Sequence, residues 1–171
     1  NSIKIKSGGI VSALYNFEGT YLSSGSINKK KLVPENYSHS WKTNKVDKQM
    51  SLVFSNNKLK SLDQKPIENE KLRKNIFEIN GVKDPLTSFL QIVYGSKKSL
   101  VVDGRRLYTM KAEYSEDIKQ TIIEITNYSN LWADHKRTNF EKIIIKRNKA
   151  GFLPNTIFIY FDGRVFKIKS S

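Results

Sequence analysis

The segment 84–108 constrains the fold of this chain most, because it contains both a marked helix start and a hairpin turn. Asp84 can accept hydrogen bonds from the first free amides of a helix, and Pro85 occupies the first helical position, where its missing N–H leaves no bond unmade. Apolar residues then recur at three- and four-residue steps for about three turns. These features predict a helix, Pro85–Gly95, followed by two short strands that meet at Asp103-Gly104.

A second helix is predicted over Ile10–Leu22, where Leu14, Phe17 and Tyr21 fall on one helical stripe. Gly19 weakens this prediction, because a glycine inside a helix costs about 1 kcal/mol relative to alanine.

The rest of the chain alternates apolar and polar residues in short runs separated by turn residues, which is typical of antiparallel strands. The predicted strands are 3–6, 36–43, 48–54, 58–62, 100–102, 107–114, 118–128, 140–147, 156–161 and 165–169. The expected fold class is therefore α+β: a strongly curved antiparallel sheet, or half-barrel, wrapped around two amphipathic helices, Ile10–Leu22 and Pro85–Gly95. We expect a single domain over residues 1–171.

The chain has a formal net charge of +14, and most of its 30 basic residues are Lys. Three interpretations are open: lysines that only solvate the surface, attraction to an anionic membrane surface or lipid headgroups, and nucleic-acid binding. Nucleic acid is the least favoured partner, because Arg rather than Lys makes bidentate contacts with phosphates and bases.

Catalytic and metal-binding patterns do not stand out. Cys is absent, which excludes disulfides and thiolate metal sites. His39 lies on a predicted aromatic strand face and His135 in a predicted loop, and nothing in their spacing brings the two imidazoles together. The sequence therefore predicts a protein that is not an enzyme and that holds no metal or cofactor. One enzymatic alternative uses Arg105 or Arg106 beside a carboxylate.

Large aromatic side chains are more numerous than one face of a thin sheet needs, and a curved sheet over two helices can leave an apolar cavity. An ordinary packed core is the alternative. After the Asp-Gly turn, two arginines could grip a phosphate or a carboxylate. The predicted ligand-binding residues are Leu14, Phe17, Tyr21, Trp41, Phe89, Val93, Arg105 and Arg106.

Several short motifs occur together in one order along the chain. They are Gly25 with Leu32, Pro34 and Tyr37, then Asp84–Ser88, Asp103–Arg106 and Leu153-Pro154. In this order they resemble the exported bacterial family called domain of unknown function 3108. The resemblance implies a periplasmic protein with a fold similar to the half-open barrels of outer-membrane lipoprotein carriers, and with no assigned activity. Two features depart from the family: its members usually begin with an additional strand pair, and many carry a Cys after the Asp-Gly turn.

The chain begins at Asn1 in mid-pattern, so we expect that a signal peptide or a longer N-terminal segment has been removed, or that the chain has been trimmed. If upstream strands are absent, the edge at Ile3–Lys6 could pair with a neighbouring chain. The expected function is non-enzymatic binding of an apolar or amphipathic ligand, such as a lipid or an acylated protein, in the cell envelope. The alternative is a basic nucleic-acid-binding module.

Overall fold

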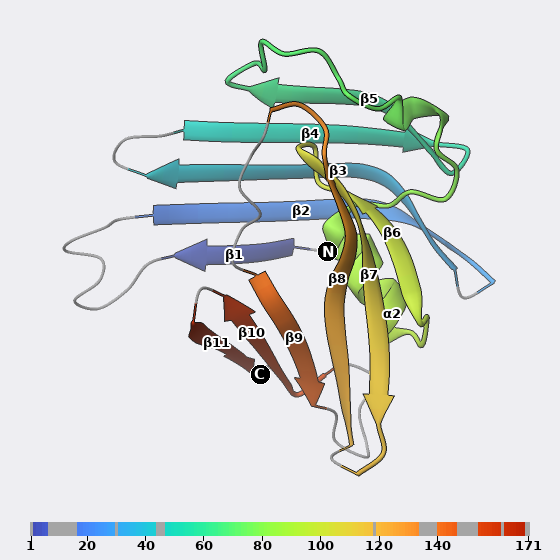
Figure 1. Ribbon diagram of the computed structural model, residues 1–171, viewed down its shortest axis with the longest axis vertical. Coiled ribbons are helices and arrows are strands. Elements are labelled where there is room, and N and C mark those ends of the chain that lie inside the picture. The colour runs from blue at the N-terminus through green and yellow to red at the C-terminus, as the bar shows by residue number, and fades with distance from the viewer. Residues whose placement is uncertain are drawn as a thin grey trace.

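Long strands with alternating side chains make up most of this protein (Figure 1). The computed structural model describes residues 2–6, 17–29, 31–43, 47–117, 119–133, 140–146, 154–161 and 163–169. Within these residues the chain forms two antiparallel sheets, one α-helix and one short 3-10 helix.

The first sheet is a meander in which each strand pairs with the next one along the chain. Its strands are β1 (Ser2–Lys6), β2 (Phe17–Asn28), β3 (Lys31–Thr43), β4 (Asp47–Ser55) and β5 (Lys58–Lys65). In β4 the alternate residues Met50, Leu52 and Phe54 are buried, so one face of the sheet lies in the core. Asn56 and Asn57 have φ values of 52° and 60°, as a tight two-residue hairpin turn requires.

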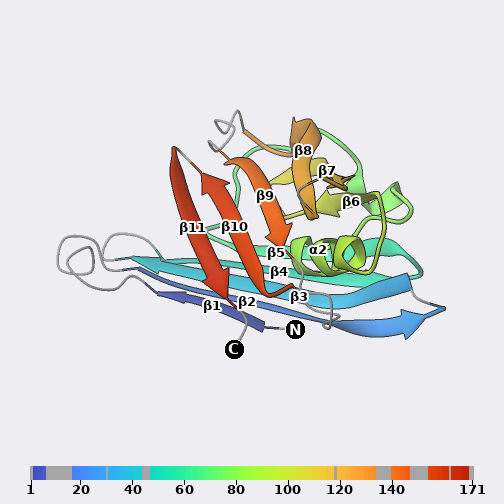
Figure 2. The ribbon, with the colours of Figure 1, turned by 90° about the horizontal axis from the view of Figure 1, so that it is seen from below.

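The second sheet is also a meander and has the order β11-β10-β9-β8-β7-β6. Its strands are β6 (Lys98–Val102), β7 (Arg106–Ser115), β8 (Gln120–Asn130), β9 (Phe140–Lys146), β10 (Thr156–Phe161) and β11 (Arg164–Lys169). Figure 1 shows these strands running across the direction of the first sheet, and Figure 2 shows the second sheet standing over one face of the first.

The helix α2 (Pro85–Val93) lies between the two sheets (Figure 2). It begins as predicted, because Asp84 Oδ1 accepts a hydrogen bond from the Thr87 amide at 2.9 Å. The other oxygen of Asp84 accepts from the Ser23 hydroxyl at 3.2 Å, which ties the helix start to β2. Farther along α2, Gln91 Oε1 accepts from the Leu32 amide at 2.7 Å. The short helix η1 (Ile76–Glu78) precedes α2 and buries Ile76.

Two clusters of buried apolar side chains join these layers, and removal of their surface from water stabilises the fold. The inner cluster joins the first sheet to the segments that flank α2; it contains Tyr37, Met50, Leu52, Phe54, Leu59, Ile76, Val82, Val102, Leu107 and Leu131. The helix cluster lies between α2 and the second sheet; it contains Ile92, Val93, Val101, Tyr108, Met110, Ile123, Ile143 and Ile145.

The predicted α+β half-barrel with two helices is wrong. Two separate open sheets are present instead of one strongly curved sheet, and α2 is the one α-helix of the described residues. The periodicity of single strands does not reveal where a sheet is divided, because that depends on which strands pair across long loops.

The predicted helix Ile10–Leu22 is also wrong where it can be compared, because Phe17–Leu22 belong to β2. Residues 10–16 lie outside the described residues. An apolar spacing of four residues fits both a helix and alternate positions of a strand. Pairing of β2 with β3 decides between them, and it places Gly19 opposite Trp41. A Cβ at Gly19 would lie 3.0 Å from the indole ring, so this glycine makes room for a cross-strand tryptophan.

Candidate functional site

An open groove of about 620 Å³ lies where the inner faces of the two sheets approach each other. Its aromatic side chains are Tyr21, Tyr37, Trp41, Tyr108, Phe140 and Phe161. Its aliphatic side chains include Met50, Leu86, Ile159 and Ile168, and its cationic ones are Lys48, Lys65, Arg105 and Arg106. The groove therefore combines apolar walls with a concentration of positive charge.

Strand β3 supplies one wall through simple alternation, which turns Tyr37, His39 and Trp41 to the same face. Cross-strand pairing places His39 opposite Tyr21 on β2 and Met50 on β4. The Tyr37 hydroxyl lies 3.2 Å from His39 Nδ1, and the rings of Tyr21 and His39 have centroids 5.6 Å apart. These side chains form a contiguous polar-aromatic wall.

Burial keeps the ionisable groups of this wall uncharged. Burial, reinforced by the nearby Arg105 cation, lowers the pKa of His39 to about 4. Burial also raises the pKa of Tyr37 and that of Tyr108 well above the ordinary value for tyrosine. At neutral pH the wall therefore presents a neutral imidazole and neutral phenols, and its charge comes from the lysine and arginine side chains.

The turn Asp103–Arg106 places the two arginines at the groove. Asp103 Oδ1 accepts hydrogen bonds from the backbone amides of Arg105 at 2.9 Å and Arg106 at 2.8 Å, which fixes the turn. Gly104 has a φ of +88° and packs on Met50 so closely that a Cβ would lie 2.2 Å from the Met50 sulfur. The Gly104 carbonyl also accepts a hydrogen bond from Trp132 Nε1 at 2.9 Å. The turn is therefore held by both sheets.

The two guanidinium groups are only loosely paired with carboxylates. Arg105 Nε lies 3.9 Å from Glu68 Oε1, and an Arg106 terminal nitrogen lies 3.9 Å from Asp103 Oδ2. Both distances exceed the range of a hydrogen bond. Arg106 Nε is buried and has no hydrogen-bond partner among the described residues, although its guanidinium lies 5.7 Å from the centre of the Tyr128 ring. These groups can therefore donate to an anionic oxygen that enters the groove.

The predicted ligand-binding residues divide into two groups. Tyr21, Trp41, Arg105 and Arg106 all line the groove, although they come from three separate parts of the chain. Phe89 packs against the helix cluster and Val93 is buried within it, so neither lines the groove. Phe17 begins β2, and Leu14 lies outside the described residues.

The predicted set did not include His39, Tyr108, Ile159, Phe161 and Ile168, which also line the groove. The alternating segment 36–43 already indicated an aromatic strand face that includes His39. The side chains from β7, β10 and β11 could not be found in the same way, because nothing local indicates which sheet faces β3.

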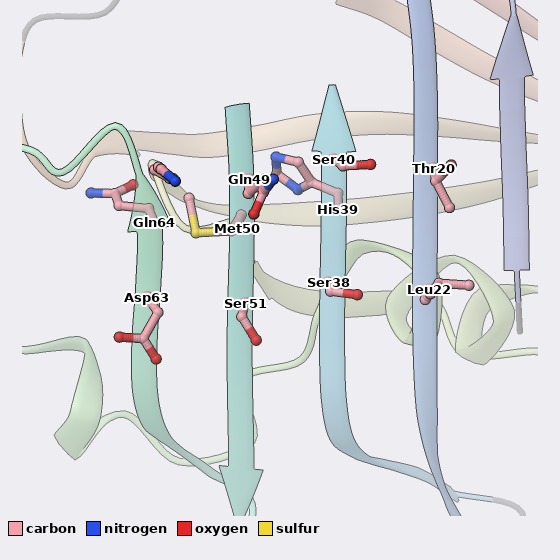
Figure 3. A pocket seen from close by; sticks show the side chains of 11 residues that line it. Thr20, Leu22, Ser38, His39, Ser40, Gln49, Met50, Ser51, Asp63 and Gln64 are labelled. Atoms are coloured by element: carbon pink, nitrogen blue, oxygen red, sulfur yellow. The ribbon is translucent and has the colours of Figure 1, made fainter. Parts of the chain in front are cut away.

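A second hollow of about 400 Å³ lies on the first sheet (Figure 3). Here the short side chains of Ser38 and Ser51 lie side by side on β3 and β4, and Asp63 follows on β5. Among the described residues, no group of three or more His, Asp or Glu side chains could hold a metal ion, here or elsewhere. The groove between the sheets is therefore the better candidate site.

In the part of the chain that the structure describes, no helix is long and apolar enough to cross a membrane. Comparison of the chain with protein-family models, curated proteins and solved structures finds no match. The resemblance to the domain of unknown function 3108 family therefore stays a prediction.

Proposed function

We propose that the groove binds an amphipathic ligand whose apolar body lies on the aromatic walls and whose anionic head lies at Arg105 and Arg106. The observation that carries this proposal is the presence, in one groove, of aromatic walls and two half-buried arginines whose ion pairs are 3.9 Å long. A purely structural pair of arginines would be expected to make closer, bidentate contacts with its carboxylates.

The size and lining of the groove suit a small lipid-like molecule. Its volume of about 620 Å³ lies within the range of about 300–1,000 Å³ that is usual for ligand pockets. Each methylene group that leaves water for such walls contributes about 0.8 kcal/mol, so an acyl chain supplies most of the binding free energy. The aromatic side chains give flat surfaces for this contact without the entropy cost of ordering flexible chains.

The head of the ligand is expected to be a carboxylate or a phosphate. The side chain of Arg106 is 18% exposed and that of Arg105 is 28% exposed, so an ion pair with a ligand would be partly shielded from water. Partial burial strengthens such a charge-assisted hydrogen bond, which contributes about 1.5–3 kcal/mol. Arg105 and Arg106 would therefore orient the ligand and select an acid over a neutral analogue.

Binding without catalysis fits the protonation states of the groove. An efficient general acid or base has a pKa near the working pH. The pKa of His39 is lowered to about 4 by burial, and the pKa of its partner Tyr37 is raised, so both groups are poorly matched to proton transfer at neutral pH. We therefore assign them to the shape and polarity of the wall.

The proposal is tested by titrating the protein with a fluorescent fatty acid and with its methyl ester. We expect saturable binding of the acid, and Arg106→Gln should weaken it about tenfold while changing ester binding little. Arg73→Gln is the matched control, because this exposed arginine lies outside the groove and pairs with Glu70. Absence of saturable binding by the wild-type protein, or an equal loss in both arginine variants, would contradict the proposal.

A further inference from the structure

The outer face of β9, β10 and β11 carries a set of lysines and aromatic rings. Ile143 and Ile145 of β9 are buried, so alternate residues of this strand point away from the core. Cross-strand pairing then brings Lys142 beside Tyr160 and Lys167 beside Phe158 on the outer face. We name this surface the lysine–aromatic face; it consists of Lys142, Lys146, Phe158, Tyr160 and Lys167.

The lysines of this face lie over the aromatic rings. Lys146 Nζ lies 5.2 Å from the centre of the Phe158 ring, and Lys167 Nζ lies 5.7 Å from the same centre. Lys142 Nζ lies 5.2 Å from the centre of the Tyr160 ring. These contacts hold the ammonium groups close to the sheet, so their charge is concentrated on one surface.

Acidic side chains do not balance this charge in the described residues of β9–β11. Glu141 is the one carboxylate there, and its Oε1 accepts a hydrogen bond from the Gly163 amide at 3.1 Å. The neighbouring strands differ, because Lys111 on β7 is paired with Glu113 and lies opposite Glu124 on β8. The excess of positive charge is therefore a property of this end of the sheet.

The edge strand β11 adds apolar surface to the same end. Val165, which is 53% exposed, lies on the lysine–aromatic face, whereas Phe166 and Ile168, which are 48% and 40% exposed, point to the other side of the strand. An exposed edge strand usually has few apolar side chains, because they invite aggregation. A surface that is basic and also projects apolar side chains suits the boundary between lipid headgroups and acyl chains.

From these observations we propose that β9–β11 dock edge-on at an anionic phospholipid bilayer, with the β11 edge inserted among the headgroups and the lysines of the lysine–aromatic face beside the headgroup phosphates. Figure 2 shows β11 as the outermost strand of the second sheet, above the edge of the first. Three residues of this end, Ile159, Phe161 and Ile168, also line the groove. These three side chains lie on the face of the strands opposite the lysine–aromatic face, so docking through the β11 edge would place the groove beside the membrane. Passage of a lipid into the groove rests on the proposed function.

Other partners fit this end of the sheet less well. A single-stranded nucleic acid would satisfy the lysines and could stack a base on an aromatic ring, but it offers no apolar phase for Val165 and Ile168. A second copy of this chain paired at β11 would bring lysines against lysines. An anionic bilayer matches both the charge and the apolar edge.

The docking is tested by co-sedimentation of the full chain with phosphatidylcholine vesicles that contain or lack phosphatidylglycerol. We expect binding only to the anionic vesicles. The triple variant Lys142→Gln, Lys146→Gln, Lys167→Gln should bind about 100-fold more weakly, since each lysine near an anionic surface contributes about 1 kcal/mol. The control Lys60→Gln, Lys71→Gln, Lys74→Gln removes the same charge from exposed positions elsewhere and should change binding much less.

Phe166→Ser keeps every charge and should weaken vesicle binding about tenfold through the lost apolar contact. Equal binding by the two triple variants would overturn the proposal, as would tight binding of a single-stranded oligonucleotide without any vesicle binding. Titration of the triple lysine variant with monomeric fluorescent fatty acid separates the two proposals. If the triple lysine variant keeps its fatty-acid affinity but no longer binds vesicles, docking is supported. If the wild-type protein binds no fatty acid, only the proposal that the groove binds a ligand is refuted.

Discussion

The two ends of the space between the sheets use the same inner faces but are filled in different ways. At one end α2 lies against the second sheet, and Ile92, Val93 and Ile123 are almost completely buried. At the other end, only the first residues of the helix, Pro85 and Leu86, contribute to the lining, and the groove remains open. Helix α2 has nine residues, which is too short to cover both ends.

The groove therefore exists because α2 fills only part of the space between the two sheets, and not because a specialised loop forms it. At the helix end, apolar side chains satisfy one another. At the groove end, the aromatic side chains of β3 share the groove with Ile159 and Phe161 of β10 and with the arginines of the Asp103–Arg106 turn. Tyr108 marks the boundary, because it belongs to the helix cluster and also lines the groove.

The largest expected effect comes from replacing a buried residue at the filled end. Ile123→Ala should lower the free energy of unfolding by about 2–5 kcal/mol, because it leaves a cavity that its neighbours cannot fill. Trp41→Ala, at the open end, should cost clearly less stability although it removes more atoms, and it should weaken ligand binding. Urea denaturation measures the free energy of unfolding of both variants, and the fluorescence titration measures ligand binding by Trp41→Ala. Equal losses would mean that the groove end is an ordinary packed core.

The turn that carries the arginines should be nearly as sensitive. Gly104→Ala should lower the free energy of unfolding by about 2–4 kcal/mol, because positive φ is strained for alanine and the new methyl group meets Met50. Gly81→Ala is the control, since Gly81 has a φ of +76° but no atom within 4 Å of an added Cβ, and it should cost about 1 kcal/mol. In a Met50→Ala background the Gly104→Ala penalty should fall to that of the control. A penalty that persists would show that contact with Met50 is not its cause.

The groove should make stability depend on pH. Burial lowers the pKa of His39 to about 4 in the folded protein, from about 6.5 in the unfolded chain. The unfolded state therefore binds the extra proton first, and stability is lost as the pH falls from about 6.5 to 4, by about 3 kcal/mol in total. His39→Gln should remove this dependence, which urea unfolding at several pH values would detect.

The buried Asp84 provides an opposite dependence that must be separated from that of His39. Burial raises the pKa of Asp84, so its contribution to stability is greatest below the ordinary carboxyl pKa and is lost as the pH rises. Asp84 is present in both proteins, so its effect cancels when the free energy of unfolding of His39→Gln is subtracted from that of the wild type at each pH. A difference that stays constant from pH 7 to pH 4 would contradict a lowered pKa of His39.

The smallest effect is expected on the outer face of the first sheet. Ser51→Ala should change the free energy of unfolding by less than about 0.5 kcal/mol and should leave fatty-acid binding unchanged, because Ser51 is exposed and lies outside the groove. Thermal unfolding and the same fluorescence titration check this. Reduced binding by Ser51→Ala would move the ligand site from the groove to the hollow in Figure 3.

Local sequence patterns determined the elements whose causes are local. The cap at Asp84, the start of the helix at Pro85 and the strand β10 are all where the sequence predicts them, although the helix ends at Val93 instead of Gly95. Each depends on a few neighbouring residues: a side chain that accepts from a free amide, or alternation along one strand. The Asp-Gly turn and its two arginines were recognised for the same reason.

Tertiary structure alone decided the strand at Phe17–Leu22, the division into two sheets and the composition of the groove. Apolar spacing in the first case fits a helix and a strand equally, and pairing with β3 selects the strand. The groove needs residues from β3, the Asp103–Arg106 turn and β10 to meet. Such contacts depend on which faces pack together across the chain, because side-chain periodicity specifies a face but not its partner.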